Sequence, residues 1–309
     1  MDIARNPTSI PGNPELADAA PEPSAPDTIR RLDYQPPAWL VPDIALEFEL
    51  GTELTKVRST LTVRQNPDAS RDQTLHLCGD NIAVMDLMVD GKPAEGWSMS
   101  GSNLLLPLPG DAHEVTIETH LHPATNSQLM GLYASNGMLC TQCEAEGFRR
   151  ITFFPDRPDV LSRYSVRMSG PKADFPILLS NGDMTASGEK DDGTHWAEWT
   201  DPWPKPSYLF ALVAGDLVAR KDSFTTMSGR KVELGVWVRP GDEDRTEHAM
   251  RSLINSMKWD EEVFGREYDL DTFNIVAVSD FNMGAMENKG LNIFNTKYVL
   301  ARADTATDF

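Results

Sequence analysis

A single acidic residue between two glycines is the first candidate for chemistry in this sequence. Glu287 lies in the run DFNMGAMENKG, residues 280–290, where Gly284 and Gly290 flank it. Because glycine lacks a Cβ, the backbone at Gly284 can come close to a bound molecule. A carboxylate at the end of a core strand can be presented to such a molecule on a rigid support. The alternative is a tight strand connection in which Glu287 is only solvated.

A second candidate stretch is CTQCEAEGFRR, residues 140–150. The CxxC spacing of Cys140 and Cys143 occurs in zinc knuckles and in redox pairs. A knuckle requires a second cysteine pair, but only Cys78 remains. A redox motif requires a helix in a βαβ unit, whereas the surrounding pattern is that of strands. The spacing is therefore weak evidence for either chemistry.

The six histidines form no metal site that the sequence can identify. No HExxH motif occurs, because His113-Glu114 is followed by VTI, and in an alternating strand these two side chains lie on opposite faces. His120 and His122 share a strand face, but no third ligand is evident, and structural zinc sites use four. We therefore expect surface histidines, no metal ligand and no catalytic residue in this chain.

Composition restricts the class of protein. Hydrophobic residues make up 40% and charged residues 24% of the 309 residues, as in ordinary soluble globular proteins. The net charge of −19 argues against nucleic acid and anionic membranes as partners, because both attract basic surfaces. No apolar stretch approaches the roughly 20 residues of a membrane span. Three cysteines, and an N-terminus unlike a secretory signal, predict free thiols and a cytoplasmic location.

Short alternating runs between residues 28 and 216 predict a β domain. Apolar and polar residues alternate in residues 44–50, 57–63 and 114–118, as in half-buried strands of an antiparallel sheet. We therefore expect an N-terminal antiparallel β-sandwich or saddle-shaped domain.

Three local signals refine this prediction. Asp90-Gly91 indicates a hairpin turn. The continuous apolar run of residues 208–214 predicts a strand that is covered on both faces. Residues 1–27 are rich in Pro, Ala and acids and predict a flexible tail.

The pattern changes near residue 216. Asp244 and Glu247 predict a capping-box start for one long helix, and apolar residues keep helical spacing until Gly265. Residues 217–309 therefore predict the β-rich beginning of an α+β domain with one long helix. Strands are expected at residues 232–238, 273–278 and 291–294.

Residues 284–288 read GAMEN, which is the exopeptidase motif of zinc aminopeptidases. The chain resembles the bacterial members of the aminopeptidase N (alanyl aminopeptidase) family of zinc metallo-aminopeptidases. The likeness continues to residue 308, includes residues 140–159 and 203–215, and covers most of residues 34–309. It implies that residues 217–309 begin a thermolysin-like catalytic domain.

The resemblance also implies roles for individual residues. Glu144, rather than Glu146, is implied to bind the free amino group of a peptide, and Gln142 and Met283 to line the pocket for its first side chain. Backbone groups at residues 284 and 285 would hold the peptide as an added strand. The implied substrate-binding residues are Gln142, Glu144, Met283, Gly284, Ala285, Met286, Glu287 and Asn288.

Two carboxylates suit this task physically. An exopeptidase must distinguish a free α-ammonium from an uncharged internal amide, and the amide would leave both carboxylates buried without a partner. Removing one partner of such a buried pair costs about 2–5 kcal/mol. We therefore expect Glu144 and Glu287 to meet between the two domains, where ligand sites are common.

The implied activity is the zinc-dependent removal of N-terminal amino acids from peptides, with a metal-activated water as nucleophile. In the family, the HExxH motif and the third zinc ligand follow GAMEN by a few dozen residues. We therefore expect the Zn²⁺ ligands beyond Phe309 and a chain that is catalytically incomplete alone. Its expected partners are peptides with a free N-terminus and the remainder of the catalytic domain.

Two other classes of function are compatible with the same scaffold. A non-catalytic binding module would predict a decayed anchoring motif, whereas GAMEN and Glu144 are intact. An epoxide hydrolase of the leukotriene type would carry GGMEN, so that Ala285 favours the peptidase.

Overall fold

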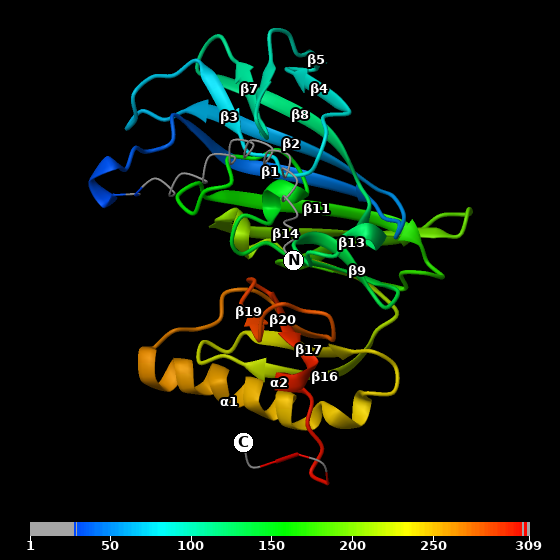
Figure 1. The fold of residues 1–309 in the computed structure, drawn as a ribbon. Helices are drawn as coiled ribbons and strands as arrows, with labels where there is room; N and C mark the ends of the chain where they lie inside the picture. Colours follow the sequence, from blue (N-terminus) through cyan, green and yellow to red (C-terminus); the bar gives the residue numbers. More distant parts are fainter. Residues whose placement is uncertain (1–27, 29, 305, 308–309) are drawn as a thin grey trace, which may run out of the picture. The chain divides into compact units, whose positions relative to one another are not determined.

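The computed structural model describes residue 28, residues 30–304 and residues 306–307 (Figure 1). The chain divides into two compact units, residues 1–35 and residues 36–309. In the first unit the described residues include one 3-10 turn, η1, at Arg31–Asp33. The tail expected at residues 1–27 lies outside the described residues.

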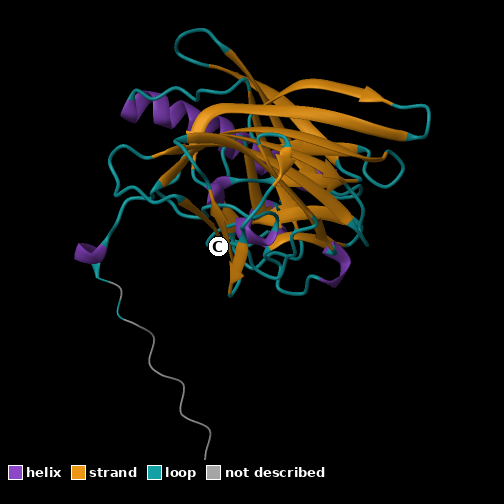
Figure 2. Ribbon diagram, turned by 90° about the horizontal axis from the view of Figure 1, so that it is seen from above, coloured by secondary structure: helices purple, strands orange, loops and turns teal. Residues whose placement is uncertain are grey.

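The second unit is mainly β with one long helix, which confirms the expected fold class (Figure 2). Its largest sheet has eight strands in the order β13-β14-β11-β1-β2-β8-β4-β5. Buried and exposed residues alternate along β2, so one face of this strand packs into the core. The strands are β1 Trp39–Glu49, β2 Thr55–Gln65, β4 Asp86–Val89, β5 Lys92–Pro93, β8 Ala112–Leu121, β11 Ser162–Pro171, β13 Asp183–Glu189 and β14 Thr194–Lys205.

One pair of strands in this sheet departs from the expected antiparallel arrangement. β1 and β11 run parallel, with Ile44 opposite Tyr164. The chain between them forms all the strands from β2 to β10, and a long crossover of this kind permits parallel pairing. Alternation along a strand predicts which face is buried, but it carries no information on the direction of the neighbouring strand.

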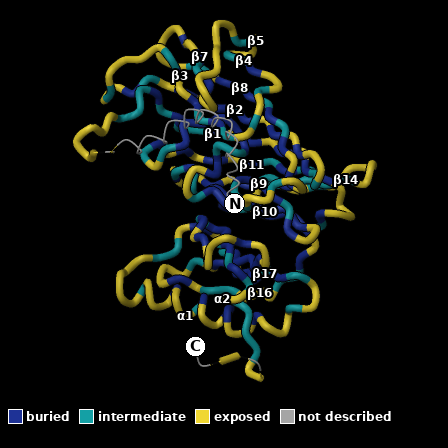
Figure 3. Tube along the Cα trace, in the orientation of Figure 1, coloured by how far each residue is buried: buried dark blue, intermediate teal, exposed yellow. Residues whose placement is uncertain are grey.

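Two smaller sheets and three 3-10 turns complete the β region, residues 39–215. The rings of Phe148 and Tyr164 pack on Phe210, with centroid distances of 5.3 and 6.0 Å, and join the large sheet to the four-stranded one. Figure 3 shows the buried positions along the strands. The elements are β12 Ile177–Ser180, β15 Leu212–Gly215, β10 Met138–Gln142 and β9 Gly131–Ser135 in the first sheet, β3 Thr74–Leu77, β7 Asn103–Pro107 and β6 Ser98–Ser100 in the second, and η2 Pro123–Thr125, η3 Phe148–Arg150 and η4 Ser207–Leu209.

Two local predictions in the β region have different outcomes. The hairpin at Asp90-Gly91 is confirmed, because both residues have positive φ, 51° and 74°, between β4 and β5. The strand expected at residues 208–214 is wrong in its first half, where η4 ends in a turn closed by the amide of Phe210 on the carbonyl of Ser207. An apolar run predicts burial, but it does not distinguish a strand from a buried turn.

The αβ region, residues 218–307, contains one five-stranded sheet in the order β16-β17-β18-β20-β19. The helix α1 lies along one face of this sheet (Figure 1), where Met250 and Leu253 pack with Val232 and Val236. The elements are β16 Val218–Thr225, β17 Lys231–Val238, η5 Glu243–Arg245, α1 Glu247–Phe264, β18 Thr272–Val278, β19 Ala285–Met286, β20 Leu291–Asn295 and α2 Thr296–Val299. The three strands expected in this part of the sequence are therefore confirmed.

The sequence predicted the C-terminal end of α1 correctly and its N-terminal end wrongly. Gly265 terminates the helix in the left-handed conformation, φ 61°, as expected. The capping box is wrong, because Thr246 rather than Asp244 is the N-cap, and its hydroxyl donates to the carbonyl of Glu243. The residues before the helix form η5 instead, and an Asp–Glu spacing does not exclude such a turn.

The last strand of the β region ends at Gly215, and the first strand of the five-stranded sheet begins at Val218. A domain boundary near residue 216 stays a prediction. Among the helices described, none is long and apolar enough to cross a membrane.

A buried ion pair lies at the end of β14. The Lys205 and Asp201 side chains are almost completely buried, and Nζ and Oδ2 are 3.0 Å apart. The two atoms lack hydrogen-bond alignment, so their attraction is mainly electrostatic. The ammonium also lies 3.9 Å from the ring centroid of Tyr164. Burial lowers the pKa of Lys205 to about 8, although the charge of Asp201 opposes the shift.

This pKa predicts a pH-dependent stability. Between the folded pKa of about 8 and the usual value of 10.5, the unfolded chain binds a proton that the folded chain does not. The contribution of Lys205 to the free energy of unfolding therefore rises with pH in this window, by about 3 kcal/mol. Urea unfolding of the native chain and of Lys205→Met should show a difference that increases in favour of the native chain across this window. A difference that stays constant with pH would contradict the prediction, and Lys92→Met, at an exposed lysine, is the control.

Candidate functional site

The GAMEN loop, which we define as residues 280–290, connects β18 to β20 and is fastened to the β region at its first residue. The Asp280 carboxylate accepts hydrogen bonds from Ser135 Oγ (2.7 Å) and Asn136 Nδ2 (3.0 Å). Its backbone carbonyl accepts one from the Tyr133 hydroxyl (2.8 Å). Burial raises the pKa of Tyr133, so this hydroxyl stays protonated and remains a donor.

The loop then runs along β9 toward the end of β10. Asn282 Nδ2 donates to the carbonyl of Gln128, just before β9 (2.9 Å). Gln142, the last residue of β10, pairs with Gly131, the first residue of β9. The contacts of the loop therefore progress toward the end of the β9–β10 hairpin where Glu144 follows. Asp280 thus lies at the turn of the β9–β10 hairpin and Asn282 near its open end, and the open end is the one that Glu144 follows.

The far end of the loop is fastened by a buried amide. Asn181 Nδ2 donates to the carbonyl of Lys289 (2.8 Å) and to that of Leu209 (3.0 Å), and its Oδ1 accepts from the amide of Ala211 (2.7 Å). Gly290 has φ 77°, and a Cβ there would lie 3.0 Å from the amide nitrogen of Gly182. Both ends of the loop therefore have fixed positions against the β region.

The two predicted anchoring carboxylates have no partner of their own. Glu144 is half-buried and Glu287 is exposed. Within the described part of the chain, neither makes an ion pair or a side-chain hydrogen bond. Glu146, by contrast, lies 3.3 Å from Arg149. The two acids of the 140–150 stretch thus differ in their partners, but the role of Glu144 and its convergence with Glu287 stay predictions.

The remaining predicted residues divide into exposed and buried positions. Met283, Gly284 and Ala285 are exposed, whereas Gln142, Met286 and Asn288 are buried. Gln142 donates through Nε2 to the carbonyl of Glu144 (3.0 Å), and its Oε1 has no partner among the described residues.

Met286 and Asn288 direct their side chains inward. The Met286 side chain packs in the hydrophobic core. Both amide atoms of Asn288 are buried without a hydrogen-bond partner in the described part of the chain. Because the Met286 side chain is buried, a peptide can contact this residue only through its backbone.

The short strand that carries Ala285 lies at an edge. Among the described strands, β19 is the last of its sheet and pairs with β20 alone, through Ala285–Phe294 and Met286–Ile293. An edge strand presents unpaired backbone groups to which an extended peptide can add.

Gly147 and Gly284 differ in whether the surrounding chain leaves space for a Cβ. A Cβ on Gly147 would lie 2.3 Å from the carbonyl oxygen of Gln142, so the turn after β10 requires this glycine. A Cβ on Gly284 would approach only the Tyr298 ring, at the ordinary distance of 3.5 Å. The packing of the chain itself therefore does not require a glycine at 284.

The described histidines and cysteines are not grouped as metal ligands. His195 Nε2 donates to the carbonyl of Phe175 and His122 Nδ1 to that of Glu53. Among the described residues, no three His, Cys, Asp or Glu side chains are grouped to hold a metal. Cys140 and Cys143 are free and buried, and burial raises the pKa of Cys140 to about 12. Neither a zinc knuckle nor a redox pair gains support, because both need a thiolate.

The structure adds residues that sequence reasoning missed. Asp280, Asn181 and Asn282 position the GAMEN loop through side-chain hydrogen bonds. Asp280 and Asn282 directly precede the motif, which was a usable signal. Asn181 precedes Gly182 and has the local signature of an ordinary turn, so nothing nearby in the sequence indicated its long-range role.

Comparison with known proteins identifies the family. Residues 93–209 match the peptidase M1 N-terminal domain, and residues 248–308 match the peptidase family M1 domain. The chain belongs to the peptidase M1 family.

Within this family the chain is similar to bacterial aminopeptidase N. It is 52% identical over 285 residues to aminopeptidase N of Caulobacter vibrioides, covering 92% of this chain and 33% of the relative. It is 49% identical over 278 residues to aminopeptidase N of Escherichia coli, covering 90% and 32%. The solved structure of Legionella pneumophila aminopeptidase A in complex with aspartic acid has a TM-score of 0.86 at 32% identity, covering 90% and 33%. The chain thus spans about a third of the length of these relatives.

Gly147 and Gly284 provide a matched pair for a stability test. Gly147→Ala should lower the free energy of unfolding by about 1–3 kcal/mol, because its Cβ collides with backbone. Gly284→Ala should change it by less than about 0.5 kcal/mol. Urea unfolding of both variants measures the contrast. Equal destabilisation would show that Gly284 is required by packing rather than left open for a ligand.

Proposed function

We propose that this chain carries the substrate-anchoring part of a zinc-dependent aminopeptidase that removes N-terminal amino acids from peptides. The observation that carries the proposal is that Glu144 and Glu287 lack side-chain partners among the described residues. The contact of Asn282 with Gln128, near the open end of the β9–β10 hairpin that Glu144 follows, supports it. The similarity to aminopeptidases over about nine-tenths of the chain supports it.

The proposed role of the two carboxylates is to select a free α-ammonium. The ammonium would lie between Glu144 and Glu287 and donate hydrogen bonds to both. Charge-assisted hydrogen bonds of this kind are about twice as strong as neutral ones. An acetylated N-terminus would remove the charge and leave the two acids facing each other without a counter-charge. The site would therefore reject blocked peptides.

The peptide backbone would add to β19. Ala285 lies on this edge strand, and the open space above Gly284 permits a second backbone to approach. Gln142 Oε1, which is buried and has no partner among the described residues, and Met283, which is 40% exposed, would border the first side chain. A flexible thioether at this place would tolerate several side-chain shapes.

Zn²⁺ is proposed as a cofactor of the whole enzyme and not of the described residues. Within these 309 residues no HExxH motif occurs. We therefore propose that the chain alone binds peptides without cleaving them, and that the remainder of the catalytic domain is its partner. The free cysteines support a cytoplasmic location.

Binding of an N-terminal ammonium can be tested with a matched pair of variants. Calorimetric titration of the 309-residue chain with alanyl peptides should detect the free N-terminus and not its acetylated form. Glu144→Gln should weaken binding by about tenfold or more, because a charged hydrogen bond is lost. Glu146→Gln, two residues away, should leave it unchanged, because Glu146 is proposed to have no contact with the peptide.

Two outcomes would contradict the anchoring role. One is equal affinity for free and acetylated peptides. The other is an equal loss in the Glu144→Gln and Glu146→Gln variants.

Turnover requires a separate experiment. The chain as given, supplied with Zn²⁺, should not release the anilide from an alanine anilide substrate, because no HExxH is present to hold the metal. A full-length aminopeptidase assayed in parallel is the positive control. Chelator-sensitive release by the 309-residue chain would contradict the proposed incompleteness. Peptide binding without turnover is also what a non-catalytic binding module would show, so the selectivity for a free N-terminus distinguishes the two.

A further inference from the structure

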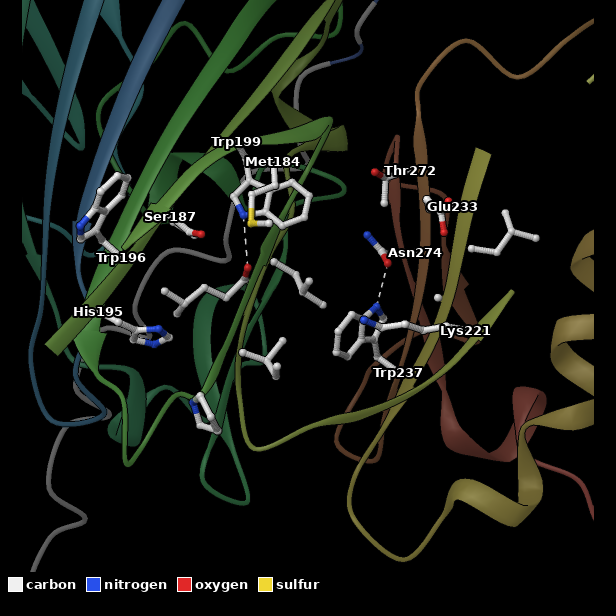
Figure 4. Close-up of a pocket in the computed structure, with 17 residues that line it drawn as sticks. Met184, Ser187, His195, Trp196, Trp199, Lys221, Glu233, Trp237, Thr272 and Asn274 are labelled. Atoms are coloured by element: carbon white, nitrogen blue, oxygen red, sulfur yellow. Dashed lines mark hydrogen bonds between the residues drawn. The ribbon is translucent and has the colours of Figure 1, made fainter. Parts of the chain in front are cut away.

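A cavity of about 430 Å³ lies between β12–β14 of the β region and β16–β18 of the αβ region. None of the eight residues proposed to bind peptide lines it. Its volume falls within the range of small-molecule sites, which often occur where two structural regions meet. Figure 4 shows Met184, Trp196 and Trp199 on one side, together with Ser187 and His195, and Lys221, Glu233, Asn274 and Trp237 on the other. The first side is mainly apolar, and His195 Nε2 is engaged with the carbonyl of Phe175.

The apolar wall is held in place by specific contacts. Trp199 Nε1 donates to the carbonyl of Leu178 (3.2 Å). The guanidinium of Arg167 lies 4.0 Å from the ring centroid of Trp196. A Cβ on Gly188 would lie 2.9 Å from Trp196 Nε1, so this glycine makes room for the indole. The wall is therefore formed before any ligand arrives.

The polar wall contains an oriented amide. Asn274 is buried, and its Oδ1 accepts a hydrogen bond from Trp237 Nε1 (2.7 Å; Figure 4). A Cβ on Gly235 would lie 2.6 Å from Trp237 Nε1 and 2.7 Å from Asn274 Oδ1, so glycine leaves space for this pair. Because Oδ1 is engaged, Nδ2 is the atom of Asn274 that is available as a donor, and no hydrogen bond between described residues uses it.

The same wall carries Lys221, an exposed lysine without a counter-charge among the described residues. Lys221 Nζ lies 5.7 Å from the ring centroid of Trp237, and no carboxylate in the described part of the chain is within ion-pair distance of it. Glu233, on the neighbouring strand, is 2.6 Å from Lys231 and is already paired. The uncompensated charge at this cavity is therefore positive, although the whole chain carries −19.

We propose that this cavity binds a small carboxylate with an apolar or aromatic body. The carboxylate lies against the Lys221 ammonium and the Asn274 amide, and the body packs on Leu178, Met184 and Trp199. Free apolar amino acids and simple apolar acids both have such a carboxylate and such a body. The proposal does not depend on the aminopeptidase assignment, because its residues and its ligand are different.

Titration with 4-phenylbutyrate, followed by tryptophan fluorescence, tests the proposal on the 309-residue chain. Three indoles line the cavity, so binding should give a saturable change. Lys221→Gln should raise the dissociation constant about tenfold or more, because a charged hydrogen bond is lost. Lys92→Gln, at an exposed lysine of the far sheet edge, should leave it unchanged.

Ligand analogues separate the head group from the body. Neutral 4-phenylbutanol should bind about tenfold or more weakly than the acid, because it lacks the charge. Tighter binding of L-phenylalanine than of 4-phenylbutyrate would support the proposal with free amino acids as the source, and the reverse would support it with simple acids. No saturable change at millimolar ligand, or equal binding by a folded Lys221→Gln variant, would overturn it.

Discussion

Asp280 and Asn181 hold the two ends of the GAMEN loop against the β region through side-chain hydrogen bonds. Asn181 is buried, so losing one of its bonds would leave a desolvated polar group unpaired, at a cost of about 1–3 kcal/mol. These bonds fix the loop to the β9–β10 hairpin at one end and to the turn after β12 at the other, in addition to its own sheet. The position of Glu287 relative to the segment of Glu144 depends on them.

The proposed selection of an ammonium combines two features, the fixed backbone of the GAMEN loop and the unpaired carboxylates of Glu144 and Glu287. Asp201 and Arg149 have partners in the structure, whereas Glu144 and Glu287 have none among the described residues. A carboxylate that lacks a cation and is accessible to solvent can bind a positively charged ligand, and the proposed pairing of Glu144 with Glu287 would strengthen this preference. The same principle, with the sign reversed, applies to Lys221 at the cavity between β12–β14 and β16–β18. The two sites would therefore select opposite charges in adjoining parts of one unit.

The sequence predicted the elements better than their arrangement. Alternation located β2 and β8, and helical spacing with Gly265 located α1, because both patterns are local. The parallel pairing of β1 with β11 and the contact of Asn181 with Lys289 join residues far apart in sequence, and no local pattern encodes them. The candidate anchoring residues came from resemblance to a family, whereas the residues that position them required the structure.

The proposed function depends on the carboxylates of Glu144 and Glu287 binding one ammonium group together. A crystal structure of the chain with a bound alanyl peptide measures this most directly. We expect the peptide's terminal nitrogen to lie within hydrogen-bonding distance of both carboxylates, with the peptide backbone paired to β19. A terminal nitrogen that contacts only one of the two acids, or carboxylates that face separate surfaces, would contradict it.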